Sequence, residues 1–236
     1  MVIIWNLFYH FLKYQILDNI RSDGHPTRKA LMHNNPPIFS DASRQFQDFL
    51  SKMAAQTLKN PKQSSALLKA TWLHTPLGAM LVIADEAALY RLDFLDTPGL
   101  LHAVNALCMK TYAALTPGIT DPIKSLTEEL CAYFTGELTA FKASFHALGS
   151  PFQQHVWRSL LSIPYGQAWS YKKQAEFLGK SSACRAVANA NGANPLSIII
   201  PCHRVIRSGG SLGGYGGGLS RKQWLIEHEK SFATSF

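Results

Sequence analysis

The sequence predicts an α/β protein in which a small α/β domain precedes a mainly helical domain with a helix-turn-helix. Short segments with strand character lie between residues 71 and 95, and two helical stretches follow them. Beyond residue 150 the apolar spacing becomes helical, and a glycine-containing turn separates two short helices. The chain has 236 residues and is 47% hydrophobic, which suffices for one large domain or two small ones.

Residues 1–66 are expected to be an N-terminal extension of unknown role, partly helix and partly linker. The first 13 residues are apolar and aromatic but too few to span a membrane. They lack the basic start and cleavage site of a signal peptide, so an amphipathic helix or an upstream extension fits better. Stretches 21–40 and 59–65 have linker composition, whereas 41–58 has helical spacing. Its apolar face comprises Phe46, Phe49, Leu50 and Met53.

Residues 67–149 are expected to form the α/β domain. The segment Thr75-Pro76-Leu77-Gly78 has the composition of a hairpin turn between two strands. Acidic residues outnumber basic ones here by eight to five, so the surface of this half is poorly suited to DNA. The candidate elements are strands at 71–74, 79–84 and 88–95 and helices at 100–114 and 123–135.

Residues 150–236 are expected to form the mainly helical domain. A first helix is predicted over 152–161. Ser170 can cap a second helix that Gly179 ends, and a third follows over about 182–190, which completes a helix-turn-helix. Ten basic residues against three acidic ones give this half most of the net charge of +8. That charge indicates either a polyanionic partner such as nucleic acid or simple solubility.

Four scattered cysteines, Cys108, Cys131, Cys184 and Cys202, form no CxxC pair. A zinc ribbon, a redox motif and a disulfide scaffold are therefore not expected, and the pattern indicates a reducing, cytoplasmic compartment. No metal site is predicted, because His74, His102, Cys108 and Cys131 have no ligand-like spacing.

Cys202 differs from the other three cysteines in its surroundings. The apolar run 196–200 and Pro201 deliver it rigidly beside the core. A thiol in such a setting should have a raised pKa and be inert, so its use as a nucleophile requires a base. His203 follows directly and is the natural base, acting through a bridging water because adjacent residues seldom bond directly.

Two further features point to a reaction centre. Glu229 lies near the C-terminal end of a helix that starts at Ser220, where a negative charge opposes the helix dipole, so a compensating role is expected. Residues 209–218 contain seven glycines around Tyr215. Since this stretch is anchored at both ends, it is expected to be a close-approach or hinge loop rather than a flexible linker.

From about Ala70 to about Lys230 the sequence resembles the O6-alkylguanine-DNA alkyltransferases (methylated-DNA–protein-cysteine methyltransferases). The resemblance is densest in PFQQHVW at 151–157, IPYG at 163–166, NGANP at 191–195 and IPCHRV at 200–205. It implies a ribonuclease H-like fold for the α/β domain and a winged-helix-like fold for the helical one. Gly216 departs from the serine that is commoner at its position, which we expect to be tolerated.

The resemblance also implies roles in the reaction. Cys202 would accept the alkyl group itself and never be regenerated. His203 and Glu229 would complete a Cys–water–His–Glu relay. Asn194 would form a hinge between the recognition element and the active-site segment. Tyr215 would line the guanine pocket and donate a proton to the leaving guanine. The other expected pocket residues are Val205, Gly216 and Gly217.

For DNA binding, the resemblance implies that Arg185 occupies the place of a nucleotide flipped out of the duplex. Tyr171 would push on the target phosphate. Small residues on the helix that carries Arg185 suit close approach to the minor groove. The other expected DNA-contacting residues are Ser170, Ala186, Asn191 and Gly192.

The implied partner is double-stranded DNA containing O6-alkylguanine, with O4-alkylthymine as a poorer substrate. No cofactor, membrane association or obligate protein partner is expected, and the protein should be a monomer, nucleoid-associated in a bacterium or nuclear in a eukaryote. One alternative is a non-catalytic relative that binds alkylated DNA, but such relatives commonly carry tryptophan in place of the cysteine. A regulatory relative or a cysteine hydrolase that turns over repeatedly are further alternatives.

Overall fold

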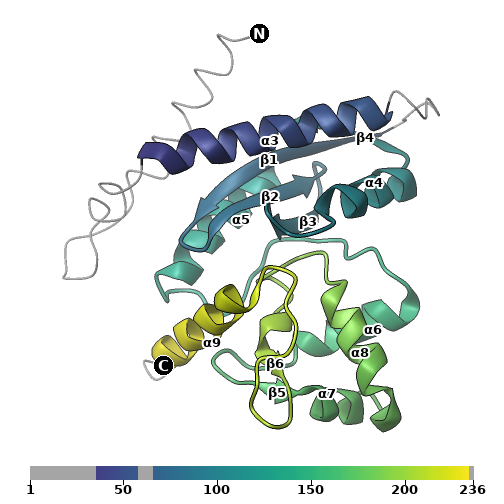
Figure 1. Cartoon of the computed structure of the whole chain (residues 1–236), viewed down its shortest axis with the longest axis vertical. Helices are drawn as coiled ribbons and strands as arrows, with labels where there is room; N and C mark the ends of the chain where they lie inside the picture. Colours follow the sequence, from purple (N-terminus) through teal and green to yellow (C-terminus); the bar gives the residue numbers. More distant parts are fainter. Residues whose placement is uncertain (1–35, 58–65, 234–236) are drawn as a thin grey trace. The chain divides into compact units, whose positions relative to one another are not determined.

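The computed structural model describes residues 36–57 and 66–233 (Figure 1). By contacts the chain divides into two units, Met1–Arg44 and Gln45–Phe236. Of the first unit only residues 36–44 are described, as the start of helix α3 (Pro36–Thr57). The expected linkers and the apolar start of the chain lie almost entirely outside the described residues. Within the described residues, no helix is long and apolar enough to cross a membrane.

The first half of the second unit is built on a four-stranded sheet. Strands β1 (Ala66–Thr75), β2 (Gly78–Ala84) and β3 (Leu89–Phe94) pair antiparallel in sequence order. Thr75 pairs with Gly78, so the hairpin predicted at 75–78 is present. Strand β4 (Ala113–Pro117) joins the other side of β1 in parallel, which gives the order β3-β2-β1-β4.

Side-chain alternation along β2 divides the hydrophobic core into two layers. Leu81 and Ile83 pack with α4 (Leu100–Thr111) and with Phe46, Phe49 and Met53 of α3. Met80, Val82 and Ala84 face the opposite layer, which contains α5 (Asp121–Phe134). The predicted apolar face of residues 41–58 is therefore confirmed for these three side chains.

The helix predicted over 100–114 is too long by three residues. Helix α4 ends at Thr111 because Tyr112 adopts a left-handed conformation with φ of 52°. The next residues, Ala113 and Ala114, pair with Ala66 and Leu67 as the start of β4. Alanine favours helix in isolation, so only the pairing partner in β1 distinguishes this strand from a helix end.

The second half of the unit is mainly helical. Helix α6 (Pro151–Leu160) comes first. Helices α7 (Tyr171–Phe177) and α8 (Cys184–Gly192) form the predicted helix-turn-helix, with the short 3-10 turn η1 (Ser181–Ala183) before α8. A second 3-10 turn, η2 (Cys202–Arg204), carries the cysteine motif. The two-residue strands β5 (Trp169–Ser170) and β6 (Val205–Ile206) pair in parallel. Helix α9 (Leu219–Ala233) is the last element among the described residues.

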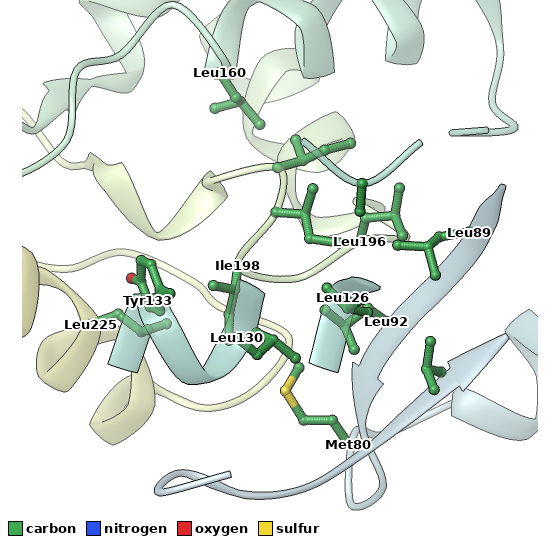
Figure 2. Close-up of a cluster of buried hydrophobic side chains, with 14 of the residues drawn as sticks. Met80, Leu89, Leu92, Leu126, Leu130, Tyr133, Leu160, Leu196, Ile198 and Leu225 are labelled. Carbon is green, nitrogen blue, oxygen red and sulfur yellow. The ribbon is translucent and has the colours of Figure 1, made fainter. Parts of the chain in front are cut away.

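The apolar run 196–200 lies against the sheet and α5. Leu92 of β3 donates its N–H to the Pro195 carbonyl at 2.9 Å, and the Ser197 N–H donates to the Leu92 carbonyl at 2.8 Å. Figure 2 shows Leu196 and Ile198 in one cluster with side chains of β3 and α5. The outer edge of β3 thus fixes the segment that leads to Cys202.

Helix α6 has a complete capping box. The Ser150 hydroxyl accepts from the Gln153 N–H at 3.2 Å, and the Gln153 side chain accepts from the Ser150 N–H at 2.8 Å. Ser150→Ala should therefore lower the free energy of unfolding by about 1 kcal/mol. Ser208→Ala, at an exposed loop position, should change it by less than about 0.5 kcal/mol. Urea denaturation measures both, and equal effects would contradict the assignment of the cap.

Candidate active site

Cys202 begins the 3-10 turn η2 directly after Pro201. Its N–H donates to the Ile200 carbonyl at 2.8 Å, and the Arg204 N–H donates to the Pro201 carbonyl at 3.0 Å. Ile198 adopts φ of 73°, a rare conformation for a β-branched residue, so the run turns sharply instead of continuing as a strand. Cys202 as a whole residue is partly buried, and burial of its thiol dominates the electrostatics of the group.

The Asn194 side chain connects the end of α8 to this turn. Its amide nitrogen donates to the Ile200 carbonyl at 2.8 Å and to the Cys202 Sγ at 3.2 Å, and its oxygen accepts from the Leu196 N–H at 3.0 Å. These bonds tie Asn194, which follows α8, to the turn that carries Cys202. Burial raises the pKa of the Cys202 thiol, and the Asn194 hydrogen bond and the Lys222 charge oppose that rise without cancelling it. The resting group is therefore a thiol.

His203 and Glu229 form a buried pair. The two side chains are 0% and 1% exposed, and His203 Nε2 lies 2.8 Å from Glu229 Oε1. Burial lowers the pKa of His203 despite the neighbouring carboxylate, so the imidazole is neutral. Because a carboxylate accepts, the proton of the neutral ring sits on Nε2 and Nδ1 carries the lone pair. Nδ1 is buried and has no hydrogen-bond partner among the described residues, so it is available as a base.

The Glu229 carboxylate also accepts from groups that sequence reasoning missed. Arg204 donates from Nε to Oε2 at 2.8 Å and from Nη2 to Oε1 at 3.0 Å. Tyr133 of α5 donates its hydroxyl to Oε1 at 2.9 Å, and the Gly166 N–H donates to Oε2 at 3.2 Å. Burial alone would raise the pKa of Glu229, but the bonds and charges of His203 and Arg204 outweigh it and lower it to about 2.

The glycine loop is a close-approach loop at two positions. A Cβ on Gly217 would lie 2.6 Å from the Phe94 ring, and one on Gly213 would lie 2.9 Å from the Tyr171 ring. Burial raises the pKa of Tyr215 well above 10, so its hydroxyl keeps its proton. That hydroxyl is buried and makes no hydrogen bond within the part of the chain described here. Gly216 is exposed beside it.

Lys222 is a further buried group near the thiol that the sequence did not reveal. Its side chain is 0% exposed, and Nζ donates to the carbonyls of Val205 at 2.6 Å and Gly214 at 3.1 Å. Burial lowers its pKa to about 8. Val205, expected to line the guanine pocket, is fully buried, and its carbonyl accepts from Lys222.

Some of the expected DNA-contacting residues are exposed, and others are partly buried. Arg185, Ala186 and Gly192 are exposed on α8. Tyr171 is half-buried near the thiol, and burial followed by the Cys202 charge raises its pKa. The Ser170 hydroxyl is occupied as the N-cap of α7, where it accepts from the Lys173 N–H at 3.0 Å.

Asn191 requires a correction. It is buried, and its amide donates to the Gln174 oxygen at 2.7 Å while Gln174 donates back at 3.3 Å. A buried amide with its hydrogen bonds satisfied cannot also reach DNA, so Asn191 instead links α7 to α8. Its position one turn from exposed residues made the two roles indistinguishable in the sequence.

The described residues contain no cluster of three or more His, Cys, Asp or Glu side chains that could hold a metal ion. Within the part of the chain that the structure describes, Cys108, Cys131 and Cys184 form no disulfide.

Two family profiles match the chain. The 6-O-methylguanine DNA methyltransferase ribonuclease-like domain matches residues 68–146, and the DNA binding domain of the same family matches residues 151–231. A methylated-DNA–protein-cysteine methyltransferase of Mycobacterium leprae is 55% identical over 161 residues, which are 67% of this chain and 90% of that protein. The chain belongs to the 6-O-methylguanine DNA methyltransferase family.

Other members of the family agree with this result. A methylated-DNA–protein-cysteine methyltransferase of Mycobacterium bovis is 54% identical over 108 residues, 46% of this chain and 66% of that protein, so this match spans just under two thirds of the relative. The crystal structure of Mycobacterium tuberculosis OGT in complex with DNA has a TM-score of 0.60 and 38% identity, over 71% of this chain and 94% of that one. The predicted fold, a ribonuclease-like domain followed by a DNA-binding domain, is confirmed.

The buried Glu229 carboxylate should contribute strongly to the free energy of unfolding of this family member. Glu229→Gln leaves the Arg204 guanidinium without its counter-charge and should cost about 3–5 kcal/mol at pH 7. The pKa of Glu229 is lower in the folded state than its ordinary value of 4.5. Its contribution is therefore complete above about pH 4.5 and is lost as the pH falls towards 2, on the order of 3 kcal/mol.

Urea denaturation between pH 7 and pH 2 measures this loss. The wild-type protein should lose more stability over the acid range than Glu229→Gln does. Glu227→Gln is the matched control, because Glu227 is exposed two residues away and its carboxylate accepts from the Gln223 side chain at 2.9 Å. Identical acid profiles for the wild type and Glu229→Gln would show that Glu229 is not an ionised, buried group.

Proposed function

We propose that this protein repairs alkylated DNA by direct reversal, as a self-inactivating methylated-DNA–protein-cysteine methyltransferase. The observation that carries this proposal is the arrangement of a thiol held by Asn194, a neutral histidine with an Nδ1 that is unpartnered among the described residues, and a buried carboxylate on its Nε2. This centre follows the helix-turn-helix directly in the chain. A nucleophile–base–orienter set of this kind activates a thiol that burial keeps protonated.

The proposed reaction moves one alkyl group and one proton. His203 Nδ1 takes the thiol proton through a water, and the Cys202 sulfur attacks the alkyl carbon of O6-alkylguanine. The carbon–O6 bond breaks as the sulfur–carbon bond forms, and the guanine leaves with the electron pair. It takes a proton from the Tyr215 hydroxyl, which recovers one from the imidazolium. The product thioether cannot be hydrolysed back, so each chain reacts once and needs no cofactor.

The substrate base lies inside a duplex, where Cys202 cannot reach it. We propose that the nucleotide is flipped out, that Arg185 fills the gap and that Tyr171 pushes on the phosphate. The exposed small residues Ala186 and Gly192 allow α8 to approach the minor groove. O4-alkylthymine would react less efficiently than O6-alkylguanine.

The wider organisation follows from this function. We propose an N-terminal extension over 1–66, an α/β domain over 67–149 and a catalytic DNA-binding domain over 150–236. The protein acts as a monomer on double-stranded DNA, without an obligate protein partner. It is cytoplasmic, associated with the nucleoid in a bacterium, or nuclear in a eukaryote.

Intact-protein mass spectrometry tests the reaction. After incubation with a duplex that bears O6-methylguanine, each wild-type chain should gain the mass of one methyl group, and Cys202→Ala should gain none. Cys184→Ala, which removes a free cysteine outside the centre, should still gain one. A folded wild-type protein of unchanged mass would refute the proposal, and multiple turnover with no mass gain would indicate a hydrolase.

Arg185 should affect access to the base and not the chemistry. Arg185→Ala should slow methyl transfer from a duplex by about tenfold or more, since the flipped state loses its substitute for the extruded base. Its reaction with free O6-benzylguanine, which needs no flipping, should be unchanged. Lys180→Ala removes an equal charge from an exposed position in the same helix-turn-helix and should weaken only DNA binding. Equal losses on both substrates would contradict the role of Arg185.

A further inference from the structure

Tyr133 brings the α/β domain into direct contact with the reaction centre. It lies near the C-terminal end of α5, is fully buried, and donates its hydroxyl to Glu229 Oε1 at 2.9 Å. The charge of the α/β domain gave no reason to expect it in the chemistry.

Helix α9 holds Tyr133 through both its backbone and its side chain. Its backbone carbonyl accepts from His228 Nε2 at 2.9 Å, while its hydroxyl binds the next residue, Glu229. The ring also packs edge-on against Phe134 and Tyr165 and tilted against Phe141. Burial, followed by the Glu229 charge, raises the pKa of Tyr133 well above 10, so the hydroxyl remains a donor. The packing and the hydrogen bonds therefore fix both the position of the Tyr133 hydroxyl and the direction in which it donates.

The oxygen that Tyr133 binds is the one that binds His203. Glu229 Oε1 accepts from Tyr133 at 2.9 Å, from His203 Nε2 at 2.8 Å and from Arg204 Nη2 at 3.0 Å. Because three donors share the negative charge of one acceptor oxygen, each donor weakens the hydrogen bonds that the other two make to it. The Tyr133 hydroxyl therefore bears on both the position of Oε1 and the negative charge that it presents to the imidazole.

We propose that Tyr133 is a positioning residue of the reaction centre, which fixes Glu229 Oε1 against His203 and moderates the basicity of the imidazole. The proposal rests on the proposed function, in which His203 is the base. It gives the α/β domain a part in alkyl transfer that does not involve DNA.

The other titratable and charged groups around this pair do not substitute for Tyr133. Arg204 is committed to both oxygens of Glu229, and His228 Nε2 is committed to the Tyr133 carbonyl. The Lys222 ammonium is bound to two backbone carbonyls, and the Cys202 thiol interacts with Asn194. The Tyr165 hydroxyl is buried near Glu229 but makes no hydrogen bond to a described residue.

Tyr165 therefore offers a matched control. Tyr133→Phe and Tyr165→Phe each remove one buried hydroxyl from neighbouring rings, but only the first removes a hydrogen bond to Glu229. In the full-length protein without DNA, ¹⁵N NMR of the His203 imidazole against pH reports its protonation, with the resonances assigned by their loss in His203→Gln. Tyr133→Phe should move the midpoint of this titration upward by about 0.5 to 1 pH unit, and Tyr165→Phe should not move it.

A second variant predicts the opposite sign. Site-specific 3-fluorotyrosine at position 133 has a more acidic hydroxyl and is a stronger donor, so it should move the midpoint downward. It keeps the ring and the hydroxyl, so it also serves if Tyr133→Phe does not fold. The acid limb of the single-turnover methyl-transfer rate should move in the same direction in each case.

An unchanged His203 midpoint in both position-133 variants, or an equal shift in Tyr165→Phe, would overturn the proposal. A loss of stability with no shift would assign Tyr133 a merely structural role and would also overturn it. If the wild-type protein transferred no methyl group while the midpoints moved as expected, the proposed function would fail and the role of Tyr133 towards His203 would stand.

Discussion

Burying the Glu229 carboxylate commits four separate parts of the chain to one arrangement. An ionised carboxylate away from water is stable only when its lone pairs accept hydrogen bonds, preferably from charged donors. Here the donors come from α5, from the turn before β5 and from η2, while the acceptor comes from α9. The chemistry needs only the His203 bond, but the charge can be buried only because the others are present. Stability and reactivity therefore depend on the same oxygen atoms.

The α/β domain contributes to the site at its edges. Besides the backbone pairing of Leu92 with 195–197, the Ser197 hydroxyl donates to Asp93 at 3.2 Å, and Asp93 is ion-paired with Arg91. From the other side, Arg221 of α9 donates to the Leu77 and Gly217 carbonyls at 2.8 and 2.9 Å and stacks over the Phe94 ring. The run before Cys202 and the glycine loop after it are thus both attached to β3 or its neighbours, which explains why loop-like segments can hold a precise geometry.

The sequence predicted most of the elements and the reacting residues, because those depend on local signals. The caps at Ser150 and Ser170, the hairpin at Thr75–Gly78 and the cysteine motif are all readable within a few residues. What it could not predict are contacts that arise between distant segments. Tyr133 lies 96 positions from Glu229, and its apolar ring satisfies a core pattern whether or not its hydroxyl is used. Nor does the sequence show that Lys222, Arg204 and Asn191 are buried, since burial depends on what packs over them.

The state of the isolated centre explains how a thiol next to a base can remain unreacted until DNA arrives. Burial raises the pKa of Cys202 and lowers the pKa of His203, so both groups are neutral at rest and no thiolate–imidazolium pair forms in advance. A protonated thiol is a poor nucleophile towards the small electrophiles of the cell. Proton transfer becomes favourable only when an alkyl carbon is placed against the sulfur and charge leaves on the guanine. In the proposed reaction each chain reacts once, so restraint of this kind protects the single equivalent that it carries. A modest donor such as Tyr133, which keeps the imidazole from becoming too basic, serves the same end.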